Sequence, residues 1–463
     1  MDYDAVVIGS GPGGYPCAIR LSQLGKHVAV IEEAQIGGEC LNFGCIPSKS
    51  LIYSSHIVTE ARKAVSAGLL KGSVSANLDE VRRRKEEAVK KLTSGVELLL
   101  KGNGVDIIKG RARIAGRNAV EVEGGELKCE QLVIATGTKF AELPHMRFDH
   151  KYILDVRDML KLDKIPPSLL ITGGGYIGVE MGQAFARLGS KVTIVEIIDQ
   201  LLPGLEAEIV KVVEKALRAD GIEIYTSSSV KEFDAASGKV VISGKHSFSA
   251  NFDAVLLSVG KRADTTSLNL GAAGIETDAK GFIKVDAQCR TSAGWVYAVG
   301  DVTGPPFLAH RATYMGKVAA EAIAGMGSAM DANAIPAVVF TEPEIATVGM
   351  TEHEAAQRGI EVRTGRFPFA ASGRAITMQQ TEGFVKLVAD RNGVLLGCQI
   401  VGSNASELIG EAALAIEMGA TLEDIALTVH PHPTLPEAIM EAADAAEEKA
   451  VDILVRRKDA GAH

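Results

Sequence analysis

Aromatic residues and long apolar runs are scarce in this sequence. Phe, Trp and Tyr make up 5% of the 463 residues, and Trp occurs once. No run reaches the roughly eighteen apolar residues that a membrane-spanning helix requires, and the N-terminus leads directly into a strand-like segment without a signal peptide. We therefore expect no membrane partner and a cytoplasmic location.

A basic excess and a regular cysteine framework are also missing. The formal net charge is −9, which argues against nonspecific binding of nucleic acid. The six cysteines are spread over the chain, and we expect Cys17, Cys129, Cys289 and Cys398 to be packed thiols. We predict no metal site. The length exceeds what one core supports and suggests several domains.

Glycine-rich turns follow two apolar, strand-like segments. Residues 4–8 lead through Gly9, Gly11 and Gly14 into a helical segment, and the next strand ends in Glu32. Glycine lets the backbone approach a pyrophosphate at the helix N-terminus, and the acidic residue holds the ribose hydroxyls. This pattern predicts a dinucleotide site.

The same pattern returns in mid-chain and predicts a second dinucleotide site. Its glycines are Gly173, Gly175 and Gly178, and its second strand ends in Glu196. A carboxylate there accepts hydrogen bonds from a free 2′-hydroxyl and repels a 2′-phosphate, which favours NAD over NADP. Alternatively, Glu196 is a solvated acid, or Lys191 or Arg187 softens the repulsion.

Cys40 and Cys45 lie shortly after the first pattern, so that site is the natural one for FAD. Cys45 precedes Ile-Pro-Ser-Lys, in which Pro47 suits the first turn of a helix. The helix N-terminus and Lys49 would then stabilise a Cys45 thiolate. We interpret the cysteines as a redox pair in which one sulfur meets an incoming thiol and the other meets the flavin. Two structural cysteines or an ordinary disulfide are the alternatives.

Further motifs extend over nearly the whole chain. They are Ala135-Thr136-Gly137, Val259-Gly260-Lys261-Arg262, Tyr297-Ala298-Val299-Gly300-Asp301, and the segments 340–349 and 430–437. With them the chain resembles the pyridine nucleotide-disulfide oxidoreductase family, and within it the branch that oxidises dihydrolipoyl groups. The resemblance implies an α/β fold with two Rossmann-like domains, for FAD and NAD, and a C-terminal α+β dimerisation domain. It also implies a homodimer that acts on dihydrolipoamide or on a lipoyl-bearing acyltransferase or carrier protein.

The resemblance also implies roles for single residues. Asp301 would contact the flavin ribityl chain, and Lys49, paired with Glu180, would lie near the flavin N5. The catalytic set would be Cys40, Cys45, Lys49, Glu180, His432 and Glu437. The FAD site would comprise Gly9, Gly11, Gly14, Glu32, Lys49, Thr136, Gly137, Asp301 and Ala309. The NAD site would comprise Gly173, Gly175, Gly178, Glu196 and Gly260.

A base is needed because a thiol must lose its proton before it attacks a disulfide. His432 suits this role, and Glu437 can fix its tautomer by accepting the other ring N–H. His430 competes, but the family pattern aligns with His432; a buried structural histidine is the remaining alternative. His432 and Glu437 would act on the cysteines of the partner subunit.

These expectations combine into one mechanism. A dithiol deprotonated by His432 attacks Cys40, its second thiol displaces that sulfur, and Cys45 is left as a thiolate that passes electrons through FAD to NAD⁺. Another flavin disulfide reductase, with a different disulfide or a quinone as acceptor, is the alternative enzyme. A non-catalytic flavoprotein subunit is the alternative from a different class.

Motif order predicts the domain limits. We expect the FAD domain in residues 1–142 and 266–333, the NAD domain in 143–265 and the dimerisation domain in 334–463. Phe43 and Met315 depart from the family pattern, which commonly has Val and Glu there. The tail from Val451 to His463 is expected to be disordered.

Overall fold

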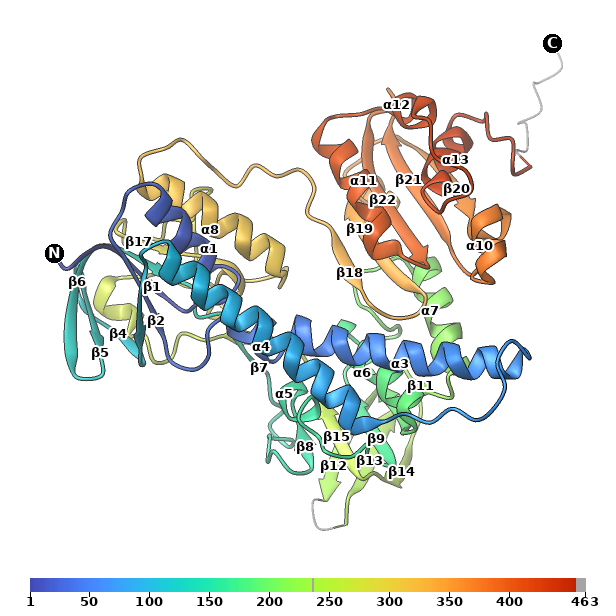
Figure 1. Cartoon of the computed structure of the whole chain (residues 1–463), viewed down its shortest axis with the longest axis horizontal. Coiled ribbons are helices and arrows are strands. Elements are labelled where there is room, and N and C mark those ends of the chain that lie inside the picture. The colour runs from blue at the N-terminus through green and yellow to red at the C-terminus, as the bar shows by residue number, and fades with distance from the viewer. Residues whose placement is uncertain (235–236, 455–463) are drawn as a thin grey trace.

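The computed structural model describes residues 1–234 and 237–454. The chain folds into an N-terminal, a central and a C-terminal lobe, and a long loop joins the last of these to α8 (Figure 1). Most of the tail expected to be disordered, residues 455–463, lies outside the described ranges. Within those ranges, no helix is both long enough and apolar enough to cross a bilayer.

The N-terminal lobe is built on a sheet with the strand order β3-β2-β1-β6-β5-β4, and β17 also pairs with β6. β1, β2, β3, β17 and the end of β6 run parallel, whereas β4, β5 and the start of β6 form an antiparallel meander. β1, β2, β17 and the end of β6 are apolar and largely buried, as expected for parallel strands covered on both faces, whereas β3 at the sheet edge is partly exposed. The strands are β1 (Tyr3–Ile8), β2 (Val28–Glu32), β3 (Asp106–Lys109), β4 (Ala112–Gly116), β5 (Ala119–Val122), β6 (Gly125–Ile134) and β17 (Val296–Ala298).

Two helices cover the parallel part of this sheet and two longer ones cross to the central lobe. α1 (Gly14–Gln23) and α8 (Ala309–Ile323) pack side by side, where a Cβ added at Gly316 would lie 2.3 Å from the Gly13 carbonyl oxygen (Figure 1). α3 (Cys45–Ser66) and α4 (Leu78–Gly102) pack together and reach the central lobe. The short elements are α2 (Gly38–Asn42), η1 (Leu270–Ala273) and η2 (Gly300–Thr303).

The central lobe repeats the strand, turn and helix of the first. Its sheet has the order β11-β10-β9-β15-β8, with parallel pairing throughout, and a meander β12-β13-β14 lies beside it. The strands are β8 (Ile153–Leu154), β9 (Ser168–Thr172), β10 (Lys191–Val195), β11 (Glu223–Tyr225), β12 (Ser228–Asp234), β13 (Lys239–Gly244), β14 (Phe248–Asn251) and β15 (Ala254–Leu257). The helices are α5 (Val156–Met159), α6 (Tyr176–Leu188) and α7 (Ala207–Ala219).

The chain crosses between these lobes along a two-stranded ribbon. β7 (Thr138–Phe140) leaves the first lobe and pairs antiparallel with β16 (Lys261–Ala263), which returns to it. β17 then rejoins the first sheet beside β6. We propose the domain limits given above on the basis of this path.

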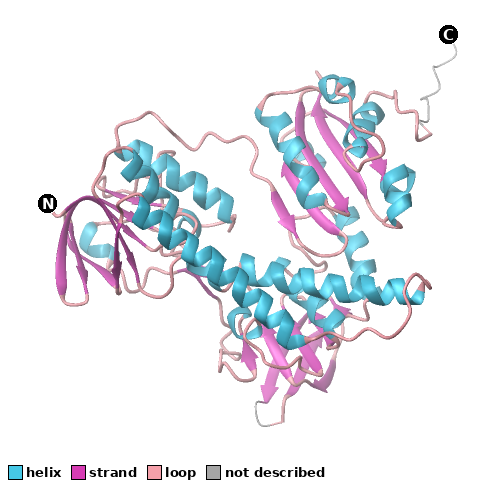
Figure 2. Cartoon of the chain, in the orientation of Figure 1, coloured by secondary structure: helices cyan, strands magenta, loops and turns pink. Residues whose placement is uncertain are grey.

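The C-terminal lobe is an antiparallel sheet with helices on it (Figure 2). The order is β18-β19-β22-β21-β20; α11 packs on β19 and β22, and α13 packs on β20 and β21. The strands are β18 (Ala337–Val339), β19 (Glu344–Gly349), β20 (Val362–Pro368), β21 (Phe384–Asp390) and β22 (Leu395–Gly402). The helices are α9 (Glu352–Gln357), η3 (Phe369–Ala371), α10 (Gly373–Met378), α11 (Ala405–Glu417), α12 (Leu422–Leu427) and α13 (Glu437–Ala446).

Candidate active site

Cys45 lies at a helix start, as the sequence predicts. Cys40 belongs to α2 and Cys45 is the first residue of α3. Both are free thiols, and the other cysteines of the chain are buried. A hydrogen bond from the Cys40 thiol, joined by the Lys49 charge and opposed by burial, lowers the pKa of Cys45 to about 7. The same hydrogen bond, together with burial, raises the pKa of Cys40. The sulfurs are therefore unequal.

Lys49 lies one turn along α3 and is paired as the resemblance implied. Its ammonium is 2.7 Å from the Glu180 carboxylate on α6, and 3% of the Glu180 side chain is exposed. The second Glu180 oxygen accepts the Phe340 N–H at 2.9 Å, and the Phe340 ring lies under the Lys49 ammonium. This pair therefore joins all three lobes beside the thiols.

The first glycine turn has the shape of a dinucleotide site. Gly9 has a φ of +99°, and a Cβ there would lie 2.4 Å from the Ala135 carbonyl oxygen; a Cβ at Gly14 would lie 1.9 Å from the Gly9 oxygen. Around Gly11, by contrast, the nearest atom to such a Cβ is 3.8 Å away. Glu32 accepts the Ser10 N–H at 2.9 Å at the end of β2. The turn is thus tight where the strand and helix meet and open where a pyrophosphate approaches.

Asp301 and Ala309 complete the far side of that site. Asp301, in η2, has only long side-chain contacts among the described residues, at 3.5 Å to Thr138 Oγ1 and 3.6 Å to Lys261 Nζ, and burial raises its pKa. Ala309 is the first residue of α8. These residues fit FAD, because an acid without a close partner faces polar groups that a ribityl hydroxyl can bridge.

The second glycine turn repeats this geometry in the central lobe. A Cβ at Gly178 would lie 2.1 Å from the Gly173 oxygen, whereas no atom lies within 4 Å of one at Gly175, which precedes α6. Glu196 follows β10, is 7% exposed, and accepts the Gly174 N–H at 2.6 Å. These residues fit NAD. The Glu196 carboxylate holds the glycine turn in place, and the open side of that turn, at Gly175, is where the ligand would bind.

Neither Lys191 nor Arg187, the two cations considered as softening the repulsion, reaches Glu196. Lys191 begins β10 and Glu196 follows its end, a separation of about 16 Å along an extended strand. The Arg187 guanidinium is 7% exposed and is bound by Asp220, at 2.9 Å, and by Glu342. The alternative weighed from the sequence therefore has no support in the structure.

Thr136, Gly137 and Gly260 lie at the ribbon between the lobes. Thr136 Oγ1 donates to the Asp264 carbonyl at 2.8 Å, and the Gly137 carbonyl accepts the Asp264 N–H at 3.1 Å. The Gly260 carbonyl accepts the Ala141 N–H at 2.9 Å. These residues therefore fix the crossing that places the two glycine turns relative to each other.

His432 lies in the loop between α12 and α13, on the C-terminal lobe. Its Nδ1 is 2.8 Å from Glu437 Oε1, and 77% of its side chain is exposed. Although burial opposes it, the Thr434 N–H and His432 hold the pKa of Glu437 below its usual range. His430, by contrast, has both ring nitrogens occupied, by the Thr428 carbonyl and by Glu411. Of these two histidines, His432 is thus the one that combines a carboxylate partner with an exposed ring.

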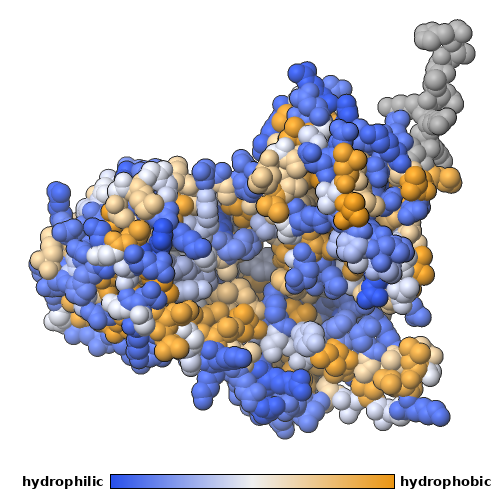
Figure 3. Space-filling view, turned by 45° about the horizontal axis from the view of Figure 1, so that its top comes forward, coloured by the Kyte–Doolittle hydropathy of each residue, from blue (hydrophilic) through white to orange (hydrophobic). Residues whose placement is uncertain are grey.

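The loop that carries His432 and the start of α3, which carries Cys45, belong to different lobes of the chain. The loop between α12 and α13 lies at the top of the C-terminal lobe, well apart from the start of α3 in the centre (Figure 1). The space-filling view shows a hollow between the N-terminal and C-terminal lobes, and apolar side chains gathered on the C-terminal lobe (Figure 3). Exposed apolar residues of that lobe include Leu414, Met418, Leu427 and Val429.

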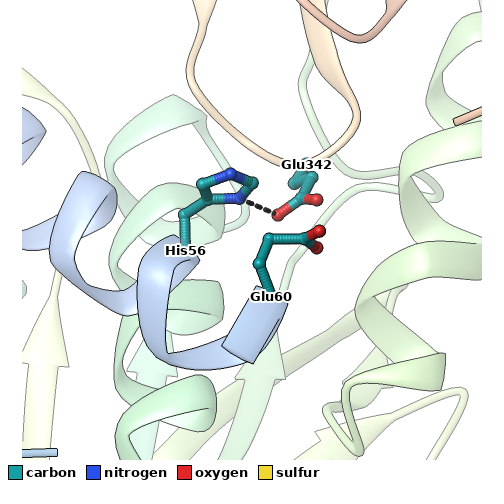
Figure 4. A group of neighbouring side chains, drawn as sticks. All are labelled: His56, Glu60 and Glu342. Atoms are coloured by element: carbon teal, nitrogen blue, oxygen red, sulfur yellow. Dashed lines mark hydrogen bonds and ion pairs between the residues drawn. The ribbon is translucent and has the colours of Figure 1, made fainter. Parts of the chain in front are cut away.

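A second polar cluster joins α3 to the C-terminal lobe. His56, Glu60 and Glu342 bring their ligand atoms within 4.8 Å of one another, and His56 Nδ1 is 2.8 Å from Glu342 Oε2 (Figure 4). Arg187 and Lys63 also bind the Glu342 carboxylate. Because these cations balance the acids, the cluster works as an ion-pair network that holds the lobes together.

The sequence predicts no role for two residues that lie beside the thiols. Glu39, which precedes Cys40, lies 2.7 Å from the ammonium of Lys261. Lys261 occurs in a motif quoted above, and Glu39 is the neighbour of Cys40, but their contact spans more than 200 residues, and no local pattern signals it. The departures from the family pattern are packed: Lys161 lies over the Phe43 ring, and Met315 is buried.

Comparison with known proteins shows how far this arrangement is shared. The family model described as pyridine nucleotide-disulphide oxidoreductase matches residues 3–316, and that of the family's dimerisation domain matches residues 335–443. The chain belongs to the pyridine nucleotide-disulphide oxidoreductase family. Its α/β class with a C-terminal dimerisation domain is thereby confirmed. FAD and a nicotinamide dinucleotide are the cofactors of this family's dihydrolipoyl dehydrogenases.

Similar family members are known from bacteria and archaea. A dihydrolipoyl dehydrogenase from Geobacillus stearothermophilus is 45% identical over 98% of each chain. One from Bacillus subtilis is 43% identical over 96% of this chain and 97% of its own. Among solved structures, LpdA from Mycobacterium tuberculosis has a TM-score of 0.88 at 29% identity, covering 95% of this chain and 98% of its own. The flavoprotein disulfide reductase RclA from Escherichia coli has a TM-score of 0.86 at 28% identity, covering 96% of this chain and 99% of its own.

Proposed function

We propose that this protein is an FAD-dependent enzyme that oxidises dihydrolipoyl groups to lipoyl groups with NAD⁺ as electron acceptor. The observation that carries the proposal is the unequal thiol pair, in which the pKa of Cys45 falls to about 7 while that of Cys40 rises. A dithiol oxidase needs this inequality, because one sulfur must be attacked and the other must leave as a stable thiolate. The relatives named dihydrolipoyl dehydrogenase support the same activity.

The oxidised pair reacts first with substrate. The partner subunit's His432 takes the proton from one substrate thiol, and the resulting thiolate attacks Cys40 and forms a mixed disulfide. The bond between Cys40 and Cys45 breaks, and the Cys45 thiolate is stabilised by Lys49 and by the N-terminus of α3. The sulfur of the second substrate thiol then attacks the mixed disulfide and closes the cyclic disulfide product, and Cys40 leaves as a thiol with the proton that this substrate thiol gives up.

Residues of the chain hold and orient the groups around this exchange. Glu437 fixes the tautomer of His432, so that Nε2 is the atom that receives the proton. Glu180 fixes Lys49 beside the thiols. Bound FAD supplies a two-electron acceptor between the thiol pair and the nicotinamide. Asp301 and the turn at Gly9 to Gly14 would hold it, and Glu196 would hold the ribose of NAD⁺.

We further propose that each active site is shared by two subunits. The chain carries the family's dimerisation domain. The loop between α12 and α13, which carries the exposed His432, lies apart from the start of α3, which carries Cys45 (Figure 1). A lipoyl-bearing acyltransferase or carrier protein is the proposed source of substrate, and a cytoplasmic location is proposed from the composition.

A comparison of acceptors tests the activity. The purified protein should oxidise NADH with lipoamide at least about tenfold more efficiently than with glutathione disulfide or a quinone, because a binding difference of 1.4 kcal/mol already gives that ratio. If glutathione disulfide or a quinone is the better acceptor, the chain is a different flavin disulfide reductase. A yellow dimer that is inert toward NADH would make it a non-catalytic flavoprotein.

A further inference from the structure

The ion pair between Glu39 and Lys261 lies beside the thiols and takes no part in the exchange described above. Glu39 Oε1 is 2.7 Å from Lys261 Nζ, and only 10% of the Lys261 side chain is exposed. Glu39 directly precedes Cys40 in α2, whereas Lys261 begins β16 in the ribbon between the lobes. The bond therefore ties the thiol segment to the ribbon that relates the two dinucleotide sites.

Several groups fix the Lys261 ammonium in one place. It lies 5.5 Å from the centre of the Phe140 ring and 6.0 Å from that of Phe307. Asp301 Oδ2 is 3.6 Å away on a third side. Two aromatic faces and two carboxylates restrict a long side chain that would otherwise be free to move.

Glu39 also lies between two cations from different lobes. Its second oxygen, Oε2, is 3.8 Å from Arg157 Nη2 in α5 of the central lobe. The charges of Arg157, Glu39, Lys261 and Asp301 therefore alternate in sign across the junction. Loss of the Glu39 carboxylate would leave two cations facing each other close to the thiols.

We propose that Glu39 is a positioning residue that holds the Lys261 ammonium near Cys45 and partly neutralises it, so that this pair sets how readily the Cys45 sulfur carries a negative charge. The proposal rests on the proposed function only in taking Cys45 as the sulfur that carries the electrons. It assigns a role to a contact that no motif of the sequence indicates.

The charged surroundings of the sulfur support this assignment. The groups that act on Cys45 are Cys40 on α2, Lys49 on α3 and Lys261 on β16, and both lysines lower its pKa. The groups that act on Lys261 are Glu39, Asp301 and Tyr176; although burial opposes them, they raise its pKa. Lys261 therefore stays protonated while Cys45 titrates.

The proposal predicts opposite effects of two substitutions. Glu39→Gln removes the counter-charge, so the field of Lys261 at Cys45 grows and the thiolate persists to lower pH. Lys261→Met removes the cation, so the thiolate forms only at higher pH. We expect shifts of about half a pH unit or more in each direction, since removing a neighbouring charge of either sign moves the pKa of a titrating thiol. A merely structural role would shift both variants in the same direction.

The test is a pH titration of the reduced holoenzyme, read by the long-wavelength absorbance of a thiolate against the flavin. The rate of iodoacetamide alkylation at Cys45, located by peptide mass, is a second readout that does not need bound FAD. Glu121→Gln is the control, because it breaks an exposed ion pair of the same lobe, 3.3 Å from Arg113. Opposite shifts for Glu39→Gln and Lys261→Met, with none for the control, are expected.

Shifts in the same direction, or none for Glu39→Gln, would overturn the proposal. For a variant that loses FAD, the alkylation rates at Cys45 decide the outcome, because this readout does not need the bound flavin. The titration reads the thiol pair of any flavin disulfide reductase. Failure of the proposal about Glu39 and Lys261 is therefore distinguishable from failure of the proposed function. The proposed function is judged by the acceptor comparison on the unaltered protein.

Discussion

The Nδ1 atom of His432 lies 2.8 Å from Glu437 Oε1, yet 77% of the His432 side chain is exposed on the C-terminal lobe. Because the loop that carries this imidazole lies apart from the start of α3 in its own chain, we expect the partner subunit to complete the site. His432→Gln and Cys45→Ser should each be inactive alone. Mixed and refolded together at equal amounts, they should regain about a quarter of the wild-type activity, because half the dimers are hybrid and each hybrid has one intact site.

The recovered activity should follow the fraction of hybrid dimers as the mixing ratio changes. His430→Gln mixed with Cys45→Ser is the matched control. The His430→Gln variant keeps its own thiol pair and its own His432, so its activity is already present before mixing and should not rise on mixing. Hybrids of His432→Gln and Cys45→Ser that stay inactive would show that the base acts within its own chain.

The buried Glu180 carboxylate should contribute to stability as well as to the site. Glu180→Ala leaves the Lys49 ammonium without its partner and the Phe340 N–H without its acceptor. We expect a loss of about 3 kcal/mol in the free energy of unfolding, the usual cost of breaking a buried pair. Glu180→Gln keeps an acceptor for Phe340 and should lose less. Urea denaturation of the FAD-loaded dimers measures both, and equal losses would contradict the expectation.

Glu196 should decide between the two nicotinamide cofactors. Glu196→Ser removes the carboxylate that repels a 2′-phosphate, so the ratio of kcat/KM for NAD over NADP should fall by at least about tenfold, equivalent to 1.4 kcal/mol. Lys191→Ala is the control, because Lys191 lies at the opposite end of β10 and the ratio should not change. An unchanged ratio in Glu196→Ser would place cofactor selection elsewhere.

The His56 contact should stabilise the fold only where the imidazole is charged. The Glu342 hydrogen bond, opposed by burial, raises the pKa of His56 above its unfolded value. This contribution is therefore fully present below the unfolded pKa and is lost as pH rises through the folded one. His56→Gln should cost about 1 kcal/mol more at pH 5.5 than at pH 8.5, after allowance for solvent screening of a side chain one-third exposed.

Thermal or urea unfolding at the two pH values measures this difference. In the background of Glu342→Gln the pH-dependent part should disappear, because the imidazolium has lost its acceptor. A cost of His56→Gln that is the same at both pH values would contradict the assignment.

Much of this site could be predicted from local sequence. Strand, glycine turn, helix and strand-end acid are close in the chain, so the turns at Gly9 and Gly173 and the placement of Glu32 and Glu196 follow from short motifs. Pro47 and the cysteine before it indicated the start of α3 in the same way, which the structure confirms.

Contacts between distant segments could not be derived from spacing. The pair of Lys49 with Glu180 was expected only through family resemblance, and the structure confirms the contact. Glu39 with Lys261 and His56 with Glu342 were not expected, because each joins segments whose approach depends on how the lobes pack. The proposed position of His432 in a partner's active site involves a second chain, which spacing within one sequence does not indicate.

The most direct test of the central claim is NAD⁺ reduction by dihydrolipoamide, compared between the unaltered protein and Cys45→Ser. We predict that the unaltered protein turns over, that reduction produces a long-wavelength absorbance band, and that Cys45→Ser loses the band and at least about a thousandfold in kcat, as expected when an essential nucleophilic group is removed. A Cys45→Ser protein that keeps both the band and full turnover would contradict the claim that this sulfur carries the electrons.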